Sequence, residues 1–125
     1  MEQITVFNKK SIEKMRVAIT LVIFKEGNMN IVYSPSLDLS GYGETEAKAK
    51  KSFETTLAET VKYAIENNTL NHLLISLGWF KNNGTNTVYK SANITSKIAT
   101  NDYLQNVINQ NNEVKFKNNV QLSFA

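Results

Sequence analysis

Residues 16–34 read RVAITLVIFKEGNMNIVYS, two apolar runs that flank a short polar turn. Apolar and largely β-branched side chains alternate along residues 16–25, which predicts a β-strand with a buried face. That face consists of Val17, Ile19, Leu21 and Ile23. Glu26-Gly27-Asn28 supplies the turn, because glycine and asparagine tolerate positive φ angles. Residues 29–34 then return as a second strand, so the pair is predicted to form an antiparallel hairpin.

A long amphipathic helix is expected after this hairpin. Residues 37–39 suit a short third strand, and Gly41-Tyr42-Gly43 is expected to break the backbone after it. Thr45 is a typical helix N-cap residue. Apolar residues then recur at three- and four-residue spacing, which predicts a helix of roughly six turns over residues 46–67. They are Ala49, Phe53, Leu57, Val61, Ala64 and Ile65.

The second half of the chain predicts shorter elements. Periodic apolar residues indicate further helices at about residues 70–77, 94–99 and 102–109. Val88 and Tyr89 fit a short strand, and residues 4–7 fit one more edge strand. Apolar residues alternate on both sides of Asn118-Asn119, so we expect a terminal hairpin with its turn at that pair.

Together these elements indicate an α+β fold: a small antiparallel sheet packed on one long helix, with short C-terminal helices and a terminal hairpin. A length of 125 residues suits one compact unit. Asparagine is concentrated late in the chain, since 14 of its 17 occurrences lie at or after Asn67. We therefore divide the chain into an α+β domain of residues 1–80 and an asparagine-rich extension of residues 81–125 packed on it.

Composition narrows the functional classes. The chain has no cysteine, which excludes disulfides and zinc fingers. It shows no apolar leader near the N-terminus, so we expect the cytoplasm of a bacterium-like cell and no membrane span. Residues 1–66 carry 9 Lys/Arg and 9 Asp/Glu, whereas residues 67–125 carry 5 and 2, which accounts for the net charge of +3. This mildly basic second half leaves nucleic-acid binding open as an alternative function.

The sequence indicates no catalytic set. His72 lies four residues before Ser76, but a nucleophile and base also need an orienting third group and an oxyanion site. A metal-dependent nuclease would need several acids that converge from central strands, and residues 16–25 contain none. The acidic candidates elsewhere are Asp38, Glu44, Glu54 and Glu59. We therefore expect a protein that is not an enzyme, with no catalytic, metal or cofactor site.

Aromatic residues are the candidates for contact with a partner. Tyr42 lies between two glycines, and Trp79 and Phe80 follow the helix stop at Gly78. Trp79-Phe80 has two interpretations, a peripheral contact of the core or an exposed anchor for a protein partner. We expect a protein partner to contact Tyr42, Trp79 or Phe80.

Residues from about 16 to 67 resemble the HicB-like antitoxin family of bacterial toxin–antitoxin systems. The resemblance rests on three short matches, Ile31-Val32-Tyr33-Ser34-Pro35, Asp38-Leu39-Ser40-Gly41 and Gly43-Glu44-Thr45-Glu46-Ala47. The family-motif positions are Tyr33, Pro35, Asp38, Leu39, Gly41, Gly43 and Thr45.

This resemblance implies a trimmed ribonuclease-H-type sheet and helix without its catalytic acids. It implies a non-catalytic antitoxin that binds and occludes a HicA-like toxin, a small double-stranded-RNA-binding-like protein that cleaves messenger RNA. Family members form dimers or larger assemblies, so a homo-oligomer is expected. Many also carry a C-terminal DNA-binding motif, but residues 80–125 end on predicted strands and fit neither a ribbon-helix-helix nor a helix-turn-helix. The alternative is a nucleic-acid-binding module or transcriptional autoregulator that acts through the basic second half.

Overall fold

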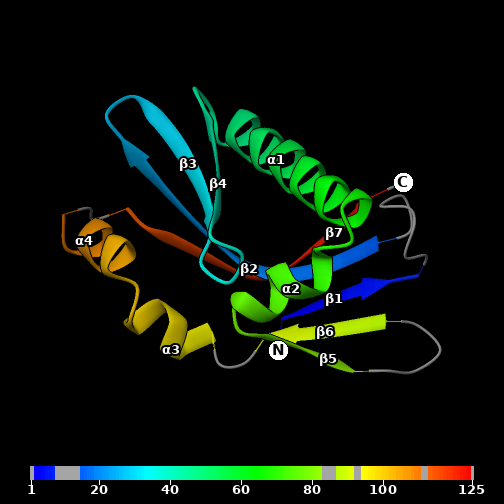
Figure 1. Cartoon of the computed structure of the whole chain (residues 1–125). Coiled ribbons are helices and arrows are strands. Elements are labelled where there is room, and N and C mark those ends of the chain that lie inside the picture. The colour runs from blue at the N-terminus through cyan, green and yellow to red at the C-terminus, as the bar shows by residue number, and fades with distance from the viewer. Residues whose placement is uncertain (1, 8–14, 83–86, 92–93, 111–112, 125) are drawn as a thin grey trace.

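The computed structural model describes residues 2–7, 15–82, 87–91, 94–110 and 113–124. Within these residues, seven strands form one antiparallel sheet, accompanied by four helices (Figure 1). The strands are β1 (Gln3–Val6), β2 (Met15–Glu26), β3 (Met29–Ser34), β4 (Leu39–Gly43), β5 (Trp79–Asn82), β6 (Thr87–Ser91) and β7 (Lys115–Phe124). The helices are α1 (Glu46–Glu66), α2 (Leu70–Ser76), α3 (Ile94–Ala99) and α4 (Asp102–Gln110). The α+β class with an antiparallel sheet is confirmed.

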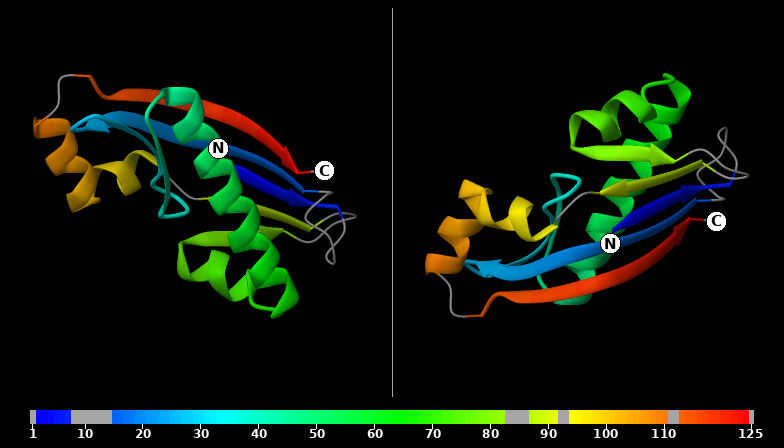
Figure 2. Two further views of the ribbon diagram at one scale, coloured as in Figure 1. Left: turned by 90° about the horizontal axis from the view of Figure 1, so that it is seen from above. Right: turned by 90° about the horizontal axis from the view of Figure 1, so that it is seen from below.

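The sheet is built on β2, with which three other strands pair. β7 runs along one edge of β2 from Met15 to Ile23, and Figure 2 shows the two strands side by side. The opposite edge is shared, because β1 pairs with residues 15–18 and β3 pairs with residues 22–26. The sheet therefore forks at residues 19–21 into a β3–β4 branch and a β1–β6–β5 branch.

The buried carboxylate of Glu2 closes this fork. Glu2 is only 6% exposed, and its Oε2 atom accepts hydrogen bonds from the backbone N–H of Thr20 (3.0 Å) and the hydroxyl of Ser36 (2.7 Å). The backbone carbonyl of Glu2 accepts a third hydrogen bond, from the N–H of Ser91 at 3.1 Å. A buried N–H without a partner costs free energy, so the carboxylate takes the place that a neighbouring strand would occupy at Thr20.

Each face of the sheet has its own apolar core. Side chains alternate along β2, so its odd-numbered residues project towards α1 and α2, while Val22 and Phe24 project towards α4. Fully buried members of the first core include Ile19, Leu21, Phe53, Leu57 and Trp79. The second core consists of Val22, Phe24, Ile31, Tyr33, Leu104 and Val107. This second core explains why β2 is apolar on both faces, and it shows that α1 is not the sheet's sole cover.

Most local predictions near the hairpin are confirmed, but the third strand expected at residues 37–39 instead runs from Leu39 to Gly43. The strands at residues 15–26 and 29–34 and the helix over residues 46–66 match their predicted positions. Thr45 caps α1, since its side-chain oxygen accepts a hydrogen bond from the N–H of Lys48 at 3.1 Å. The shorter helices also lie where apolar spacing predicted them. None of the helices in the described part of the chain is both long and apolar enough to cross a membrane.

The expected backbone break at Gly41-Tyr42-Gly43 is wrong. These residues belong to β4, which packs against α1 so closely that no side chain fits at Gly41 or Gly43 on its helix-facing side. A Cβ atom on Gly41 would lie 2.2 Å from the backbone nitrogen of Phe53, and one on Gly43 would lie 2.4 Å from that of Ala49. The glycines therefore permit close packing of strand and helix rather than a turn.

The expected terminal hairpin is also wrong. β7 is a single strand, and its register on β2 shifts between Ile19 and Leu21. Asn119 has a positive φ of 54° beside this shift, so the asparagine pair forms a β-bulge within the strand.

Two further expectations concerned chain organisation. The strand expected at residues 4–7 exists as β1, but it lies between β2 and β6 rather than at an edge. The division after residue 80 falls inside β5, and β6 and β7 are strands of the same sheet as β1 to β4.

Replacement of Glu2 tests the closure of the fork. We expect Glu2→Ala to lower the free energy of unfolding by about 3 kcal/mol, because it leaves the Thr20 N–H and the Ser36 hydroxyl without their acceptor. Glu2→Gln retains an acceptor oxygen and should cost less, and Glu59→Ala on the exposed side of α1 should cost under about 0.5 kcal/mol. Urea unfolding monitored by circular dichroism measures all three, and equal losses for Glu2→Ala and Glu59→Ala would contradict the assignment.

Replacement of Gly41 tests the packing of β4 on α1. Gly41→Ala should destabilise the protein by about 3 kcal/mol or more, because the added methyl group must push two backbone segments apart. Ser40→Ala is the matched control, since Ser40 lies on the opposite side of β4, and it should cost under about 1 kcal/mol. Thermal unfolding of both variants against the wild type measures the difference; a Gly41→Ala protein as stable as the control would refute the close approach.

Candidate functional site

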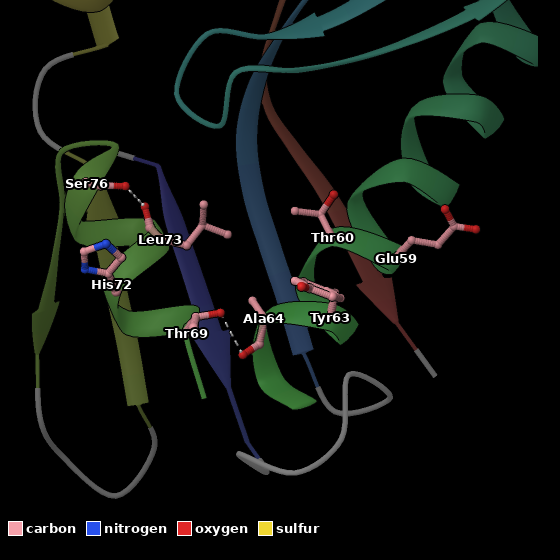
Figure 3. Close-up of a pocket in the computed structure, with 8 residues that line it drawn as sticks. All are labelled: Glu59, Thr60, Tyr63, Ala64, Thr69, His72, Leu73 and Ser76. Atoms are coloured by element: carbon pink, nitrogen blue, oxygen red, sulfur yellow. Dashed lines mark hydrogen bonds between the residues drawn. The ribbon is translucent and has the colours of Figure 1, made fainter. Parts of the chain in front are cut away.

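An open groove of about 610 Å³ separates α1 from α2 (Figure 3). Its walls are formed by Glu59, Thr60, Tyr63, Ala64, Thr69, His72, Leu73 and Ser76. Ser76 does not act with His72, because its hydroxyl donates a hydrogen bond to the backbone carbonyl of Leu73 at 2.7 Å. Glu59 projects from the opposite wall, on α1. The groove therefore brings His72 and Ser76 onto one wall without the ordered contacts of a nucleophile and its base.

The four acidic candidates are dispersed by the fold. Asp38 lies in the β3–β4 turn, Glu44 forms an ion pair with Lys48 at 3.8 Å, and Glu54 and Glu59 lie along α1. Among the described residues, no three His, Cys, Asp or Glu side chains come together as a metal site would require. The arrangement of a two-metal nuclease is thus not formed by these four acids.

The first family-motif positions shape the turn between β3 and β4. The hydroxyl of Tyr33 donates a hydrogen bond to Oδ1 of Asp38 at 2.9 Å and accepts one from Nδ2 of Asn101 at 2.8 Å. Asp38 has a positive φ of 52°, and its N–H donates to the carbonyl of Ser34 at 2.8 Å. Tyr33 and Asp38 therefore hold the turn together and connect it to the start of α4.

The other motif positions support the sheet and helix that follow. Gly41 and Gly43 allow α1 to approach β4, and Thr45 caps that helix. Leu39 packs against the first core, and Pro35 is partly buried in the turn. Gly41, Gly43 and Thr45 thus support the packing of α1 on β4.

Exposed apolar side chains gather on the outer side of β4. Tyr42 is 55% exposed, Tyr103 of α4 is 45% exposed, and Met29 at the start of β3 is 40% exposed. Register places Tyr42 beside Ile31 and Ile31 beside Phe24, so these side chains share the sheet face on which α4 packs. We name Met29, Tyr42 and Tyr103 the Tyr42 surface. Clustered exposed tyrosines are typical of protein interfaces.

Tyr103 is the member of this surface that could not be identified from the sequence. Its ring meets Tyr33 and Phe24 edge-on, with centroids 5.6 Å and 6.1 Å away. Its hydroxyl donates a hydrogen bond to Oε1 of Glu26 at 3.0 Å. Burial and the nearby Glu26 carboxylate raise the pKa of Tyr103 to about 12. The sequence predicted that Tyr103 lies in the first turn of an amphipathic helix. It did not predict which strands that helix packs against.

Trp79 and Phe80 lie elsewhere. Trp79 is 2% exposed, and its indole N–H donates a hydrogen bond to the carbonyl of Ser36 at 2.9 Å, so it is a core residue and the exposed-anchor interpretation is wrong. Phe80 is 42% exposed, but it belongs to β5, at the opposite end of the strand order from β4. The structure therefore groups Tyr42 with Tyr103 rather than with Trp79 and Phe80.

The raised pKa of Tyr103 predicts a pH dependence. The unfolded tyrosine ionises near pH 10, whereas the folded one stays protonated to about pH 12. The stabilisation from Tyr103 is therefore complete below about pH 10 and is lost as the pH rises towards 12. We expect the free energy of unfolding to decline less steeply between about pH 9 and pH 11 in Tyr103→Phe than in the wild type. Urea unfolding at several pH values measures both slopes, and identical slopes would contradict the shift.

We compared the chain with protein-family models, curated protein sequences and solved structures, and none of them matches it.

Proposed function

We propose that this chain is a non-catalytic antitoxin that binds a HicA-like, mRNA-cleaving toxin in the bacterial cytoplasm and holds it inactive by occlusion. The observation that carries the proposal is the exposure of Tyr42 and Tyr103 on one surface built partly from the motif-bearing segment. Tyrosine supplies a large contact area at low entropic cost, and exposed apolar clusters mark sites of protein association.

The motif-bearing segment supports this proposal as a unit. β2, β3, β4 and α1 are consecutive in the chain, and their motif residues fix the turn, the strand–helix approach and the helix cap. A HicB-type arrangement of these four elements, and a homo-oligomer paired through the sheet edges at β4 or β5, belong to the same proposal.

The alternative, nucleic-acid binding through the basic second half, has less support. The Lys97 ammonium donates a hydrogen bond to the carbonyl of Leu77 at 2.7 Å. Lys115 and Lys117 lie 3.3 Å and 3.6 Å from the carboxylate of Glu46. Three of the five cations after residue 66 thus already have partners within the chain. Nucleic-acid binding depends on lysine and arginine side chains that contact phosphates and thereby release counterions.

Co-expression tests the proposed function. We expect this protein to restore growth to cells that express the product of the adjacent short gene, and to co-purify with that product. The control is the same toxin expressed with an empty vector. An isolated gene, or a neighbour whose toxicity this chain does not relieve, would overturn the proposal. If the purified chain instead retains RNA or DNA on filters with a steep salt dependence, the alternative function is correct.

A further inference from the structure

We propose that the sheet face opposite α1 binds a short segment of single-stranded nucleic acid. Side chains from β7, β2, β1, β6 and β5 form this face, so it combines residues from both halves of the chain. The activity is separate from the contact of the Tyr42 surface with a toxin, and it depends on different residues. The register, exposure and charge of ten side chains support it.

Strand register aligns these ten side chains in two rows across five strands. Residues that are direct partners in an antiparallel pair project from the same face of the sheet. The first row, from β7 to β5, consists of Ser123, Arg16, Thr5, Val88 and Asn82. The second row consists of Gln121, Ala18, Gln3, Lys90 and Phe80. We name these ten residues the open face.

The open face is accessible to a ligand. None of its ten residues is buried, whereas their neighbours on the other side of the same strands are buried: Ile4, Val17, Trp79, Tyr89 and Leu122. The apolar core with α1 and α2 covers that other side. In the right-hand view of Figure 2, α3 and α4 lie towards one end of the sheet rather than across these five strands.

The charge of the open face is positive. Arg16 and Lys90 are its charged residues, and none of the ten is acidic, although the chain contains 11 Asp and Glu residues. Such a face attracts an anion. It is unfavourable for face-to-face contact with a second copy of itself, because both surfaces would be cationic.

An exposed aromatic ring lies beside each of these cations. Phe80 is the register partner of Lys90 and is 42% exposed. Phe7, which follows β1, is also 42% exposed, and the centre of its ring lies 5.2 Å from the guanidinium carbon of Arg16. Proteins that bind single strands combine cations for the backbone with aromatic rings and guanidinium planes on which bases stack. The two Phe–cation pairs supply both kinds of contact.

A polar hollow lies between these elements. It has a volume of about 290 Å³, and its polar lining consists of Gln3, Thr5, Arg16, Asn119 and Gln121. The Gln3 amide nitrogen donates a hydrogen bond to Oγ1 of Thr5 at 3.1 Å. Amide side chains offer both donors and acceptors, as the edges of unpaired bases require. Amides and stacking rings favour a nucleic acid over an acidic peptide, and unpaired bases over a duplex.

Fluorescence anisotropy of the purified full-length protein with labelled 12-nucleotide oligouridine and oligothymidine tests the proposal. We expect binding with a slope of log K against log salt of about −1.4, because two cations contact phosphates. Arg16→Gln/Lys90→Gln should weaken binding about tenfold or more and flatten that slope. Phe80→Ala should weaken it about fivefold or more. Comparison of the two oligonucleotides shows whether the face prefers RNA or DNA.

Two variants on α1 are the matched controls. Lys51→Gln/Lys62→Gln removes the same charge from exposed positions on the other side of the molecule. Tyr63→Ala removes a ring that is 69% exposed. Both should bind as the wild type does, and circular dichroism of every variant verifies the fold.

Four outcomes would overturn the proposal: no binding by the wild type, equal binding by the open-face variants, equal binding of a duplex, or equal displacement of the oligonucleotide by a polyglutamate peptide. A much steeper salt slope that Arg16→Gln/Lys90→Gln leaves unchanged would also overturn it, because the phosphates would then contact other cations, as in the alternative function. None of these measurements uses a toxin, so their failure and that of the growth-rescue test are independent.

Discussion

The structure depends on how two strands share one edge of β2. β1 and β3 both pair with that edge, and between them lies a backbone N–H at Thr20 that neither strand can satisfy. The carboxylate of Glu2 satisfies it, and the same oxygen binds Ser36, whose carbonyl accepts the indole N–H of Trp79. Glu2 thus links β2 to the β3–β4 turn through its side chain, and contacts β6 through its backbone carbonyl.

Local signals were sufficient for the β2–β3 hairpin and for α1. The strands at residues 15–34 combine period-two alternation with a turn, and α1 combines a cap at Thr45 with a regular apolar stripe. Each of these features is specified by neighbours in the sequence, which is why both type and position were predictable. The short helices followed from the same periodicity.

Features that depend on distant partners were not predictable. A positive φ at an asparagine serves a hairpin turn and a bulge equally well, and only pairing with β2 decides that Asn118-Asn119 is a bulge. Likewise, Gly41 and Gly43 could either interrupt a strand or allow a helix to pack closely against it. The structure shows the second, because α1 packs directly against both glycines. The candidate site was only partly predictable for the same reason. Tyr42 was identified in the sequence, but Tyr103 lies near it only because α4 packs on Phe24 and Tyr33.

The long pairing between β2 and β7 also affects how the chain folds as it is made. Met15 pairs with Phe124, so one edge of the central strand has no partner until roughly a hundred more residues have left the ribosome. During that interval, β2 exposes an apolar, β-branched edge of the kind that recruits other chains. Contacts so distant in sequence also slow folding. The nascent protein therefore has a period of vulnerability to aggregation that ends only when β7 docks.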